Sequence, residues 1–377
     1  IFSKSLASVL IVLISGSAVL AGPFDVTDAD YIARGTKLAA DGKIDKTCLP
    51  VAAKPPASAY VPIVFPSDAL VAAATQDGQL FINSGISDEN TVSAFQATFT
   101  LRYPKIKLTI AAGASAAAEE RFLADHAVGN QAVDGVITNK RAWAERAFKE
   151  KALESIDITI PGFFAQWPDG FWRWNLSAGV TAPAFYRPLG IAYNSDLVKD
   201  ELIPKQYKDL ANPAFKGALL GLNPDSSATY ARVWKHIMDN VDETTMKAIG
   251  ANLMKTPLYA DVQPAAQALG AGGGLALMQM GANVGATMRG DGAPVQVVMP
   301  DSTTGSEYAY GVATKARHPN AAKLFAHWLY STEGQWVSSC AAYAGSVAYP
   351  EYGAKGFVPI ESVSKEEMAK LKKLLGL

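Results

Sequence analysis

Short apolar strands alternate with helical segments along much of this chain, and the alternation limits the folds that it can adopt. Residues 68–78 (DALVAAATQDG) predict a helix that ends at its final glycine, and residues 79–83 (QLFIN) form an apolar strand. The order recurs with a helix over 91–104, a strand over 105–112 and, after one more helix, a strand over 132–138. Elements in this order form a parallel sheet with helices on both faces. The sequence therefore predicts an α/β fold.

The alternation breaks once and then resumes, which indicates two units. Residues 160–188 hold three of the seven tryptophans and show no strand–helix order. A strand follows at 187–195, and residues 204–241 supply a helix, a buried strand and another helix. Two amphipathic helices end the chain, one over 318–330 and one behind a capping box that begins at Ser364. At roughly 100 to 200 residues per domain, the length suits two compact units.

The N-terminal residues have the pattern of an export signal. Lys4 precedes an apolar run over 6–21 that ends in small residues, as signal peptidase requires. The strongly apolar part is shorter than the ~20 residues that span a membrane, so a cleaved signal over 1–21 is favoured over an anchor. The next residue is Gly22 and not a cysteine, which leaves no acceptor for a lipid anchor. We expect a soluble periplasmic protein that begins with an extension over 22–62, which is rich in proline and lacks a core of its own.

Charge and cysteine content narrow the classes of function. The chain has 34 basic and 35 acidic residues, so no broad positive field is available for a nucleic acid. Cys48 and Cys340 are the only cysteines, and in an oxidising compartment a disulfide is favoured over two buried thiols. The four histidines show no zinc-like spacing with either cysteine, and we expect neither a metal site nor a cofactor. They are His126, His236, His318 and His327.

Several longer strings carry a resemblance to a known family when they are taken in order. They resemble the iron(III)-type branch of the bacterial ABC-transporter solute-binding proteins, from about residue 68 to residue 335. Each string alone is weak, but their order and spacing match the family. The strings are ALVAAATQDGQLFINSG (69–85), FTLRYPKIKLTIAAGAS (99–115), GIAYNSDLV (190–198), PKQYKDLANPAFKGALLGLNPDSSATY (204–230) and HPNAAKLFAHWLYSTEGQ (318–335).

The resemblance implies a two-lobe fold of the type II periplasmic binding protein kind, in which each lobe is a mixed, mostly parallel sheet flanked by helices. Solute would bind in the cleft between the lobes, and a membrane permease would read cleft closure, with no chemistry by this chain. A sensor subunit with a receptor as its partner would look the same in sequence. We expect a monomer whose lobes cross near 187–194 and 308–314. The expected lobes are residues 63–186 plus 312–345, and 187–311 plus part of 346–377.

Candidate ligand-binding residues follow the predicted strands, where loops meet the first turns of helices. Helix capping explains any one of these polar groups, but several groups that converge on one cleft favour binding. Arg187 is an isolated cation that can grip a carboxylate or phosphate, the alternative being a surface salt bridge. The candidates after strands are Ser84, Ser87, Asp88, Ser115, Thr138, Asn139, Ser226, Ser227 and Thr229. Candidates for aromatic walls, or otherwise for core packing, are Tyr186, Tyr308, Tyr310, Trp172 and Trp174.

The same resemblance bears on the cargo. Ferric-ion binders of the family offer a His and a Glu from the first lobe and two adjacent tyrosines from the second. The matching positions here are Asp88, Asn139 and the pair Gly281 and Ala282. Hard Fe(III) needs anionic oxygen ligands, so the loss of two phenolates argues against bare iron. We expect a larger organic anion, with Gln279 and Asn283 beside the vacated space; a ferric ion or ferric chelate is the alternative.

One enzyme hypothesis competes with binding. GASAA (113–117) follows a predicted strand and opens a helix, which loosely resembles the nucleophile elbow of a serine hydrolase with Ser115 as nucleophile. No segment supplies a histidine and an acid in convincing triad order. The glycine run over 270–274 lacks the residues of a nucleotide-binding loop. We therefore expect no enzymatic activity and keep a secreted serine hydrolase as the rival.

Overall fold

The computed structural model describes residues 28–57, 66–113, 116–163, 182–254, 258–346, 348–359 and 362–377. The expected signal peptide, Ser115, Trp172 and Trp174 lie outside these ranges. Within them, no helix combines the length and the apolar character that a membrane crossing demands.

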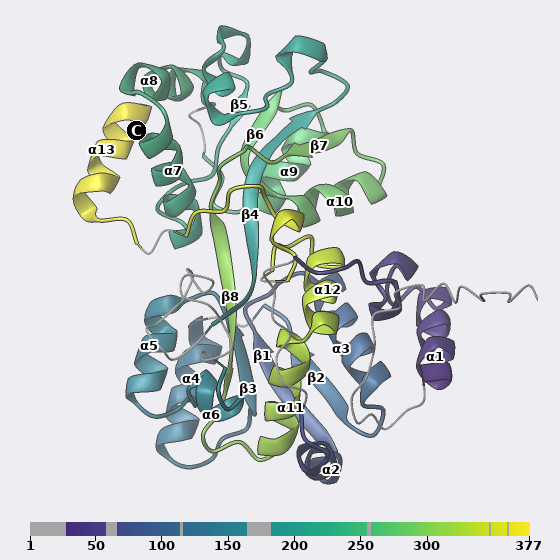
Figure 1. Ribbon diagram of the computed structural model, residues 1–377. Helices are drawn as coiled ribbons and strands as arrows, with labels where there is room; N and C mark the ends of the chain where they lie inside the picture. The colour runs from purple at the N-terminus through teal and green to yellow at the C-terminus, as the bar shows by residue number, and fades with distance from the viewer. Residues whose placement is uncertain are drawn as a thin grey trace, which may run out of the picture.

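Two lobes share one continuous run of strands (Figure 1). Its order is β2-β1-β3-β8-β4-β6-β5, and β7 also pairs with β4. The pairs β1–β2, β1–β3 and β5–β6 are parallel, as the strand–helix alternation predicts, but β8 and β4 pair antiparallel with all their neighbours. The strands are β1 Gln79–Ser84, β2 Lys107–Ala111, β3 Gly135–Thr138, β4 Pro183–Asn194, β5 Leu219–Leu220, β6 Ala276–Gly281, β7 Val295–Val298 and β8 Gly305–Val312.

Helices cover the strands of each lobe, and the longest strands, β4 and β8, run from one lobe into the other (Figure 1). The first lobe carries α2 Asp68–Asp77, α3 Glu89–Arg102, α4 Ala116–Ala127, α5 Arg141–Lys149, α6 Ile156–Thr159, α11 Pro319–Tyr330 and α12 Thr332–Cys340. The second lobe carries α7 Ala228–Asn240, α8 Glu243–Asn252, α9 Val262–Gly270, α10 Ala282–Gly290 and α13 Lys365–Leu375.

Each lobe has its own hydrophobic core. In the first lobe, Phe95 and Phe99 of α3 pack edge-on against Trp328 of α11. In the second lobe, Trp234 of α7 is fully buried, and Leu371 of α13 joins the same core. The last helix therefore belongs to the second lobe although α11 and α12, which precede it in the chain, belong to the first.

The described part of the N-terminal extension packs on the first lobe. It contains a helix, α1 Asp28–Ala40, within the segment that the sequence predicts only as a proline-rich extension. The ring of Tyr31 lies 3.8 Å from the guanidinium carbon of Arg102, which is fully buried and pairs with Glu333. A disulfide joins Cys48 to Cys340 at the end of α12, with an S–S distance of 2.03 Å. Both contacts fix the extension to the lobe.

Candidate functional site

A polar cleft of about 680 Å³ lies between the two lobes. Its first-lobe wall comes from the loop after β1 and from Asn139 after β3. Its second-lobe wall comes from the starts of α7, α9 and α10, and β8 contributes Ser306 and Tyr308 from between the lobes. The carboxyl ends of β1, β3 and β6 all point toward this space, as ligand sites in open α/β sheets require.

Four helices begin at the cleft, and three of them are capped by their own side chains. Asp88 caps α3, Ser227 caps α7, and Asp261 caps α9. The fourth helix, α10, has Gly281 as its N-cap residue, which offers no side-chain cap. Asn283 and the backbone of the first α10 turn line the cleft beside it. The free amide donors of this turn suit an acceptor group on a ligand.

Gln279 enters the cleft wall through an irregularity in β6. The register between β4 and β6 passes from Met280 to Met278, so Gln279 is the extra residue of a β-bulge. Its φ of 71° lies in the left-handed region, which costs energy for a residue other than glycine. Its Nε2 donates to the carbonyl of Tyr230 at 3.3 Å, and its buried Oε1 has no partner among the described residues. The bulge thus brings an unused acceptor to the cleft.

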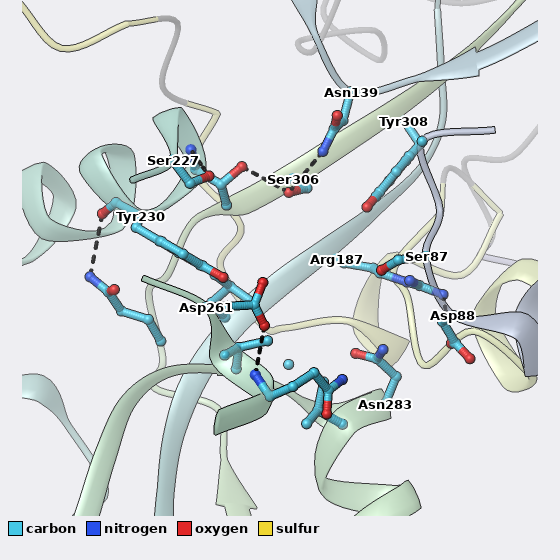
Figure 2. Close-up of a pocket in the computed structure, with 18 of the residues that line it drawn as sticks. Ser87, Asp88, Asn139, Arg187, Ser227, Tyr230, Asp261, Asn283, Ser306 and Tyr308 are labelled. Carbon is cyan, nitrogen blue, oxygen red and sulfur yellow. Dashed lines mark hydrogen bonds and ion pairs between the residues drawn. The ribbon is translucent and has the colours of Figure 1, made fainter. Parts of the chain in front are cut away.

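Arg187 lies at the other side of the cleft, on β4, and is only 8% exposed. Its Nη2 donates to Oδ2 of Asp88 at 3.2 Å and to Oγ1 of Thr91 at 2.6 Å. The ring centroid of Tyr308 is 5.8 Å from its guanidinium carbon. Its Nε has no hydrogen-bond partner among the described residues. Figure 2 shows the guanidinium beside Ser87 and Asp88.

A short chain of polar side chains connects the two lobes. Nδ2 of Asn139 donates to Oγ of Ser306 at 3.5 Å, and Oγ of Ser306 lies 3.1 Å from Oγ1 of Thr229 on α7. Figure 2 shows Asn139 and Ser306 pointing toward one another across the top of the cleft. Ser306 therefore lies between groups from both lobes.

Tyr230 and Asp261 form the second-lobe rim. The ring of Tyr230 runs toward Asp261 in Figure 2. Burial, with a smaller contribution from the Asp261 carboxylate, raises the pKa of Tyr230 to about 12. The phenol of Tyr230 is therefore protonated at neutral pH and can donate a hydrogen bond to a solute.

Most of the sequence candidates meet at this cleft, and three do not. Ser84 is fully buried and its Oγ accepts from the amide of Ile86; Thr138 bonds to Glu119 and Lys140. Ser226 is exposed, outside the cleft, and donates to the carbonyl of Asn223. Ser115 lies outside the described residues. The candidates that line the cleft are Ser87, Asp88, Asn139, Arg187, Ser227, Thr229, Gln279, Asn283 and Tyr308.

The sequence reasoning missed several lining residues. Ser306 precedes the candidate Tyr308 by two residues on β8, so strand alternation places both on one face. Tyr230 directly follows Thr229, and Asp261 stands before a helical period, where a cap is expected. Of the aromatic candidates, Tyr186 and Tyr310 are buried outside the cleft lining.

The described residues contain no group of three or more His, Cys, Asp or Glu side chains that could hold a metal ion. The ferric-ion binders that this chain resembles have their iron ligands at the positions of Asp88, Asn139, Gly281 and Ala282. Asp88 is already used by Arg187 and by the cap of α3.

Comparison with known proteins gives a family match and a consistent set of folds. The model of the family described as bacterial extracellular solute-binding protein matches residues 80–337. No curated protein sequence matches the chain. Among solved structures, the substrate-binding protein of an ABC transporter from Agrobacterium tumefaciens is 15% identical, with a TM-score of 0.59. The alignment covers 80% of this chain and 95% of that one.

Two further structures show how widely the cargo varies on this fold. A Trichodesmium protein (IdiA, FutA) in complex with iron and citrate is 19% identical, with a TM-score of 0.57, over 79% of this chain and 98% of that one. The spermidine/putrescine transporter's substrate-binding protein from Streptococcus pneumoniae is 13% identical, with a TM-score of 0.56, over 78% and 97%. At these identities the comparison establishes the fold alone.

Proposed function

Because this chain belongs to the family of bacterial extracellular solute-binding proteins, we propose that it captures a small organic anion in the cleft between its lobes and delivers it to the permease of an ABC importer. The family acts outside the cytoplasm. We place this member in the periplasm, reached through a signal over 1–21, and expect it to work as a monomer without a cofactor. Residues 63–186 plus 312–345, and 187–311 plus part of 346–377, are the lobes that close on the solute.

The observation that carries this proposal is a polar cleft of about 680 Å³ to which both lobes contribute side chains. A solute shifts a hinge equilibrium toward closure only if it contacts both lobes at once. Asn139 of the first lobe and Thr229 and Asn283 of the second can meet one small molecule here. A permease can then recognise the closed form of the protein as the form that holds solute.

The two rival functions find less support. Direct binding of a ferric ion needs a cluster of anionic ligands, and the described residues do not contain one. A serine hydrolase of the Ser–His–Asp type needs a histidine near its nucleophile. No histidine is among the residues that line the cleft, and Ser115 lies outside the described residues. Binding without chemistry is the function that the cleft supports best.

A ligand screen tests the proposal. The purified protein is melted with phosphonates, sugar phosphates, carboxylates, polyamines and ferric chelates, after native mass spectrometry to detect a co-purified solute. A ligand present at 100 times its dissociation constant stabilises the folded state by about 2.7 kcal/mol, which raises the melting temperature measurably. We expect a shift from one class of organic anion. Absence of any shift, together with turnover of ester substrates, would falsify the binding function.

A further inference from the structure

The charged side chains near the cleft separate into an exposed set and a buried set. Glu89 and Asp261 line the cleft but are exposed to solvent, and Asp88, which is partly buried, lines it in an ion pair with Arg187. Arg187 and Arg232 are each only 8% exposed. Water and salt screen exposed charges far more than buried ones, so the buried cations have the larger effect on a bound solute.

Arg232 does not line the cleft itself but lies one side chain behind it. It belongs to α7, and its Nη2 donates to Oγ1 of Thr229, one turn earlier, at 3.1 Å. Its Nε has no hydrogen-bond partner among the described residues. Burial lowers the pKa of Arg232, and the nearby Glu307 and Tyr308 oppose that effect. A buried guanidinium that donates to a neutral hydroxyl needs a reason to be there.

The hydrogen bonds around Thr229 give that reason. A guanidinium can only donate, so Thr229 accepts from Arg232, while either hydroxyl of the Thr229–Ser306 contact can be its donor. Ser306 also accepts from Nδ2 of Asn139, so one hydroxyl proton of the Thr229–Ser306 pair remains available to the cleft, which both residues line. Ser227 accepts from the amide of Thr229, so its proton is also available. This corner of the cleft offers donors to a solute.

Arg187 approaches the same corner from the other side. In the β4–β8 ladder, Arg187 is the register partner of Ser306. Its Nε is a buried donor without a partner among the described residues, although Arg187 lines the cleft. The N-terminus of α7, with its partial positive charge, is part of the same corner. Two buried guanidinium groups thus bracket Ser306, and each has one carboxylate nearby, Asp88 beside Arg187 and Glu307 beside Arg232.

We propose that Ser227, Thr229 and Ser306 form the subsite for the anionic group of the solute, and that Arg232 is its positioning residue, acting through Thr229. The proposal rests on the proposed function and names where the anion is held. The group that fits is acceptor-only, such as a phosphate, phosphonate or carboxylate. It does not touch Arg232; the guanidinium orients the hydroxyls and supplies positive potential from behind them.

Three variants test the role of Arg232. Arg232→Met removes the charge and the donor while filling the same space, and Arg232→Lys restores the charge and one donor. Lys235→Met is the matched control because it removes one positive charge from the same helix, where Lys235 pairs with Asp239 and Glu367 away from the cleft. Isothermal titration measures the binding of inorganic phosphate, fructose 6-phosphate and fructose to each protein, and melting of the unliganded proteins reports folding.

We expect Arg232→Met to bind the phosphate-bearing probes at least about tenfold more weakly than wild type, since a hydrogen bond to a charged group is lost from the network. Arg232→Lys should recover part of this loss, and Lys235→Met should bind as wild type does. The loss should exceed any change in fructose binding, which a merely structural defect would lower equally. Equal affinity of Arg232→Met and wild type for the phosphate probes would overturn the positioning role.

A wild-type protein that binds polyamines or uncharged sugars but neither phosphate nor any carboxylate would overturn the anion subsite and leave solute capture intact. Failure of the proposed function itself looks different, because then no member of the screening panel binds the wild-type protein.

Discussion

Hydroxyl side chains at helix starts serve capping and binding alike, and only the fold separates the two uses. Ser226 and Ser227 are neighbours at the start of α7. Ser227 caps the helix and lines the cleft, whereas Ser226 is exposed and bonds to the carbonyl of Asn223. The sequence assigns both to the ligand because both precede a helix. Ser226 precedes Ser227 by one residue, and its hydroxyl points away from the cleft.

This difference gives a paired prediction. Ser227→Ala should cost about 1 kcal/mol of stability as a lost cap and should also weaken solute binding. Ser226→Ala should change affinity by less than twofold, because its hydroxyl does not reach the cleft. Titration of both variants with the solute found by the screen, beside their melting curves, checks the pair. Equal losses of affinity would show that the anion extends beyond the cleft corner.

Gly281 gives a second prediction at this scale. A Cβ on Gly281 would lie 2.5 Å from Oδ1 of Asn283, and its φ of −75° suits any residue. The conflict is therefore with the end of one flexible side chain, which must leave its place in the cleft wall. Gly281→Ala should change the free energy of unfolding by no more than about 0.5 kcal/mol. Affinity should fall about threefold to tenfold, the value of one neutral hydrogen bond.

Gly290→Ala is the control for this variant. Gly290 ends the same helix, and a Cβ there would meet nothing within 4 Å. It should bind solute as wild type does. If Gly281→Ala also binds normally, then Asn283 is not a ligand contact and the α10 start acts through its backbone alone.

At the scale of elements, the sequence predicts those helices whose starts and ends depend on local capping interactions. The helix over 68–78 is found as α2, with Ser67 as N-cap and Gly78 in the left-handed conformation at its end. The capping box of Ser364 with Glu367 begins α13 as expected. Helix starts and the strands before them therefore identify most of the cleft loops.

The pairing of strands that are far apart in the sequence cannot be predicted from helix starts and periodicity. The antiparallel placement of β8 between β3 and β4 depends on contacts between residues more than a hundred positions apart, such as Arg187 with Ser306. The bulge at Gln279 depends on how β6 meets β4, and the apolar run LALMQMG gives no sign of it. The sequence does not identify Arg232 as a candidate because a single arginine in an amphipathic helix is usually exposed. Only its burial in the structure distinguishes Arg232 from a surface arginine.

The α13 capping box makes a prediction about pH. The backbone amide of Ser364 and the side chain of Lys235 lower the pKa of Glu367 to about 2 from an ordinary value near 4.5. A carboxyl whose pKa is lower in the folded state stabilises the fold above its unfolded pKa. That contribution disappears as the pH falls from about 4.5 toward 2. The protection factors of the α13 amides, which compare their exchange with that of an unstructured chain at the same pH, should therefore fall over this range.

Glu367→Gln isolates the effect. At each pH above 4.5 the α13 amides of the variant should be less protected than those of wild type. The two proteins should converge only below about pH 2, where the Glu367 carboxyl is protonated in the folded state as well. Glu366→Gln, in the same turn, removes a carboxylate that does not take part in the capping box. If the difference in α13 protection between wild type and Glu367→Gln stays constant with pH, then the charge of Glu367 does not stabilise the helix.

At the scale of the whole molecule, the chain ends are used to hold each lobe. The last helix, α13, packs against α7 and α8 of the second lobe. The extension is fixed to the first lobe by the ring of Tyr31 on Arg102 and by the Cys48–Cys340 disulfide. The two long strands β4 and β8 run between the lobes that these attachments hold (Figure 1).

The disulfide gives the last prediction, because it joins residues 292 positions apart and so closes most of the chain into a loop. Cross-linking so long a loop restricts the unfolded chain, and the chain-entropy model assigns it about 4 to 5 kcal/mol of stability. Denaturant unfolding of a Cys48→Ser/Cys340→Ser variant should show a loss of this size. Wild type under reducing conditions should fall to the variant's stability, whereas the variant should not respond to reductant. A double variant within about 1 kcal/mol of oxidised wild type would show that the extension is held by the contacts of Tyr31 and the buried Leu49 instead.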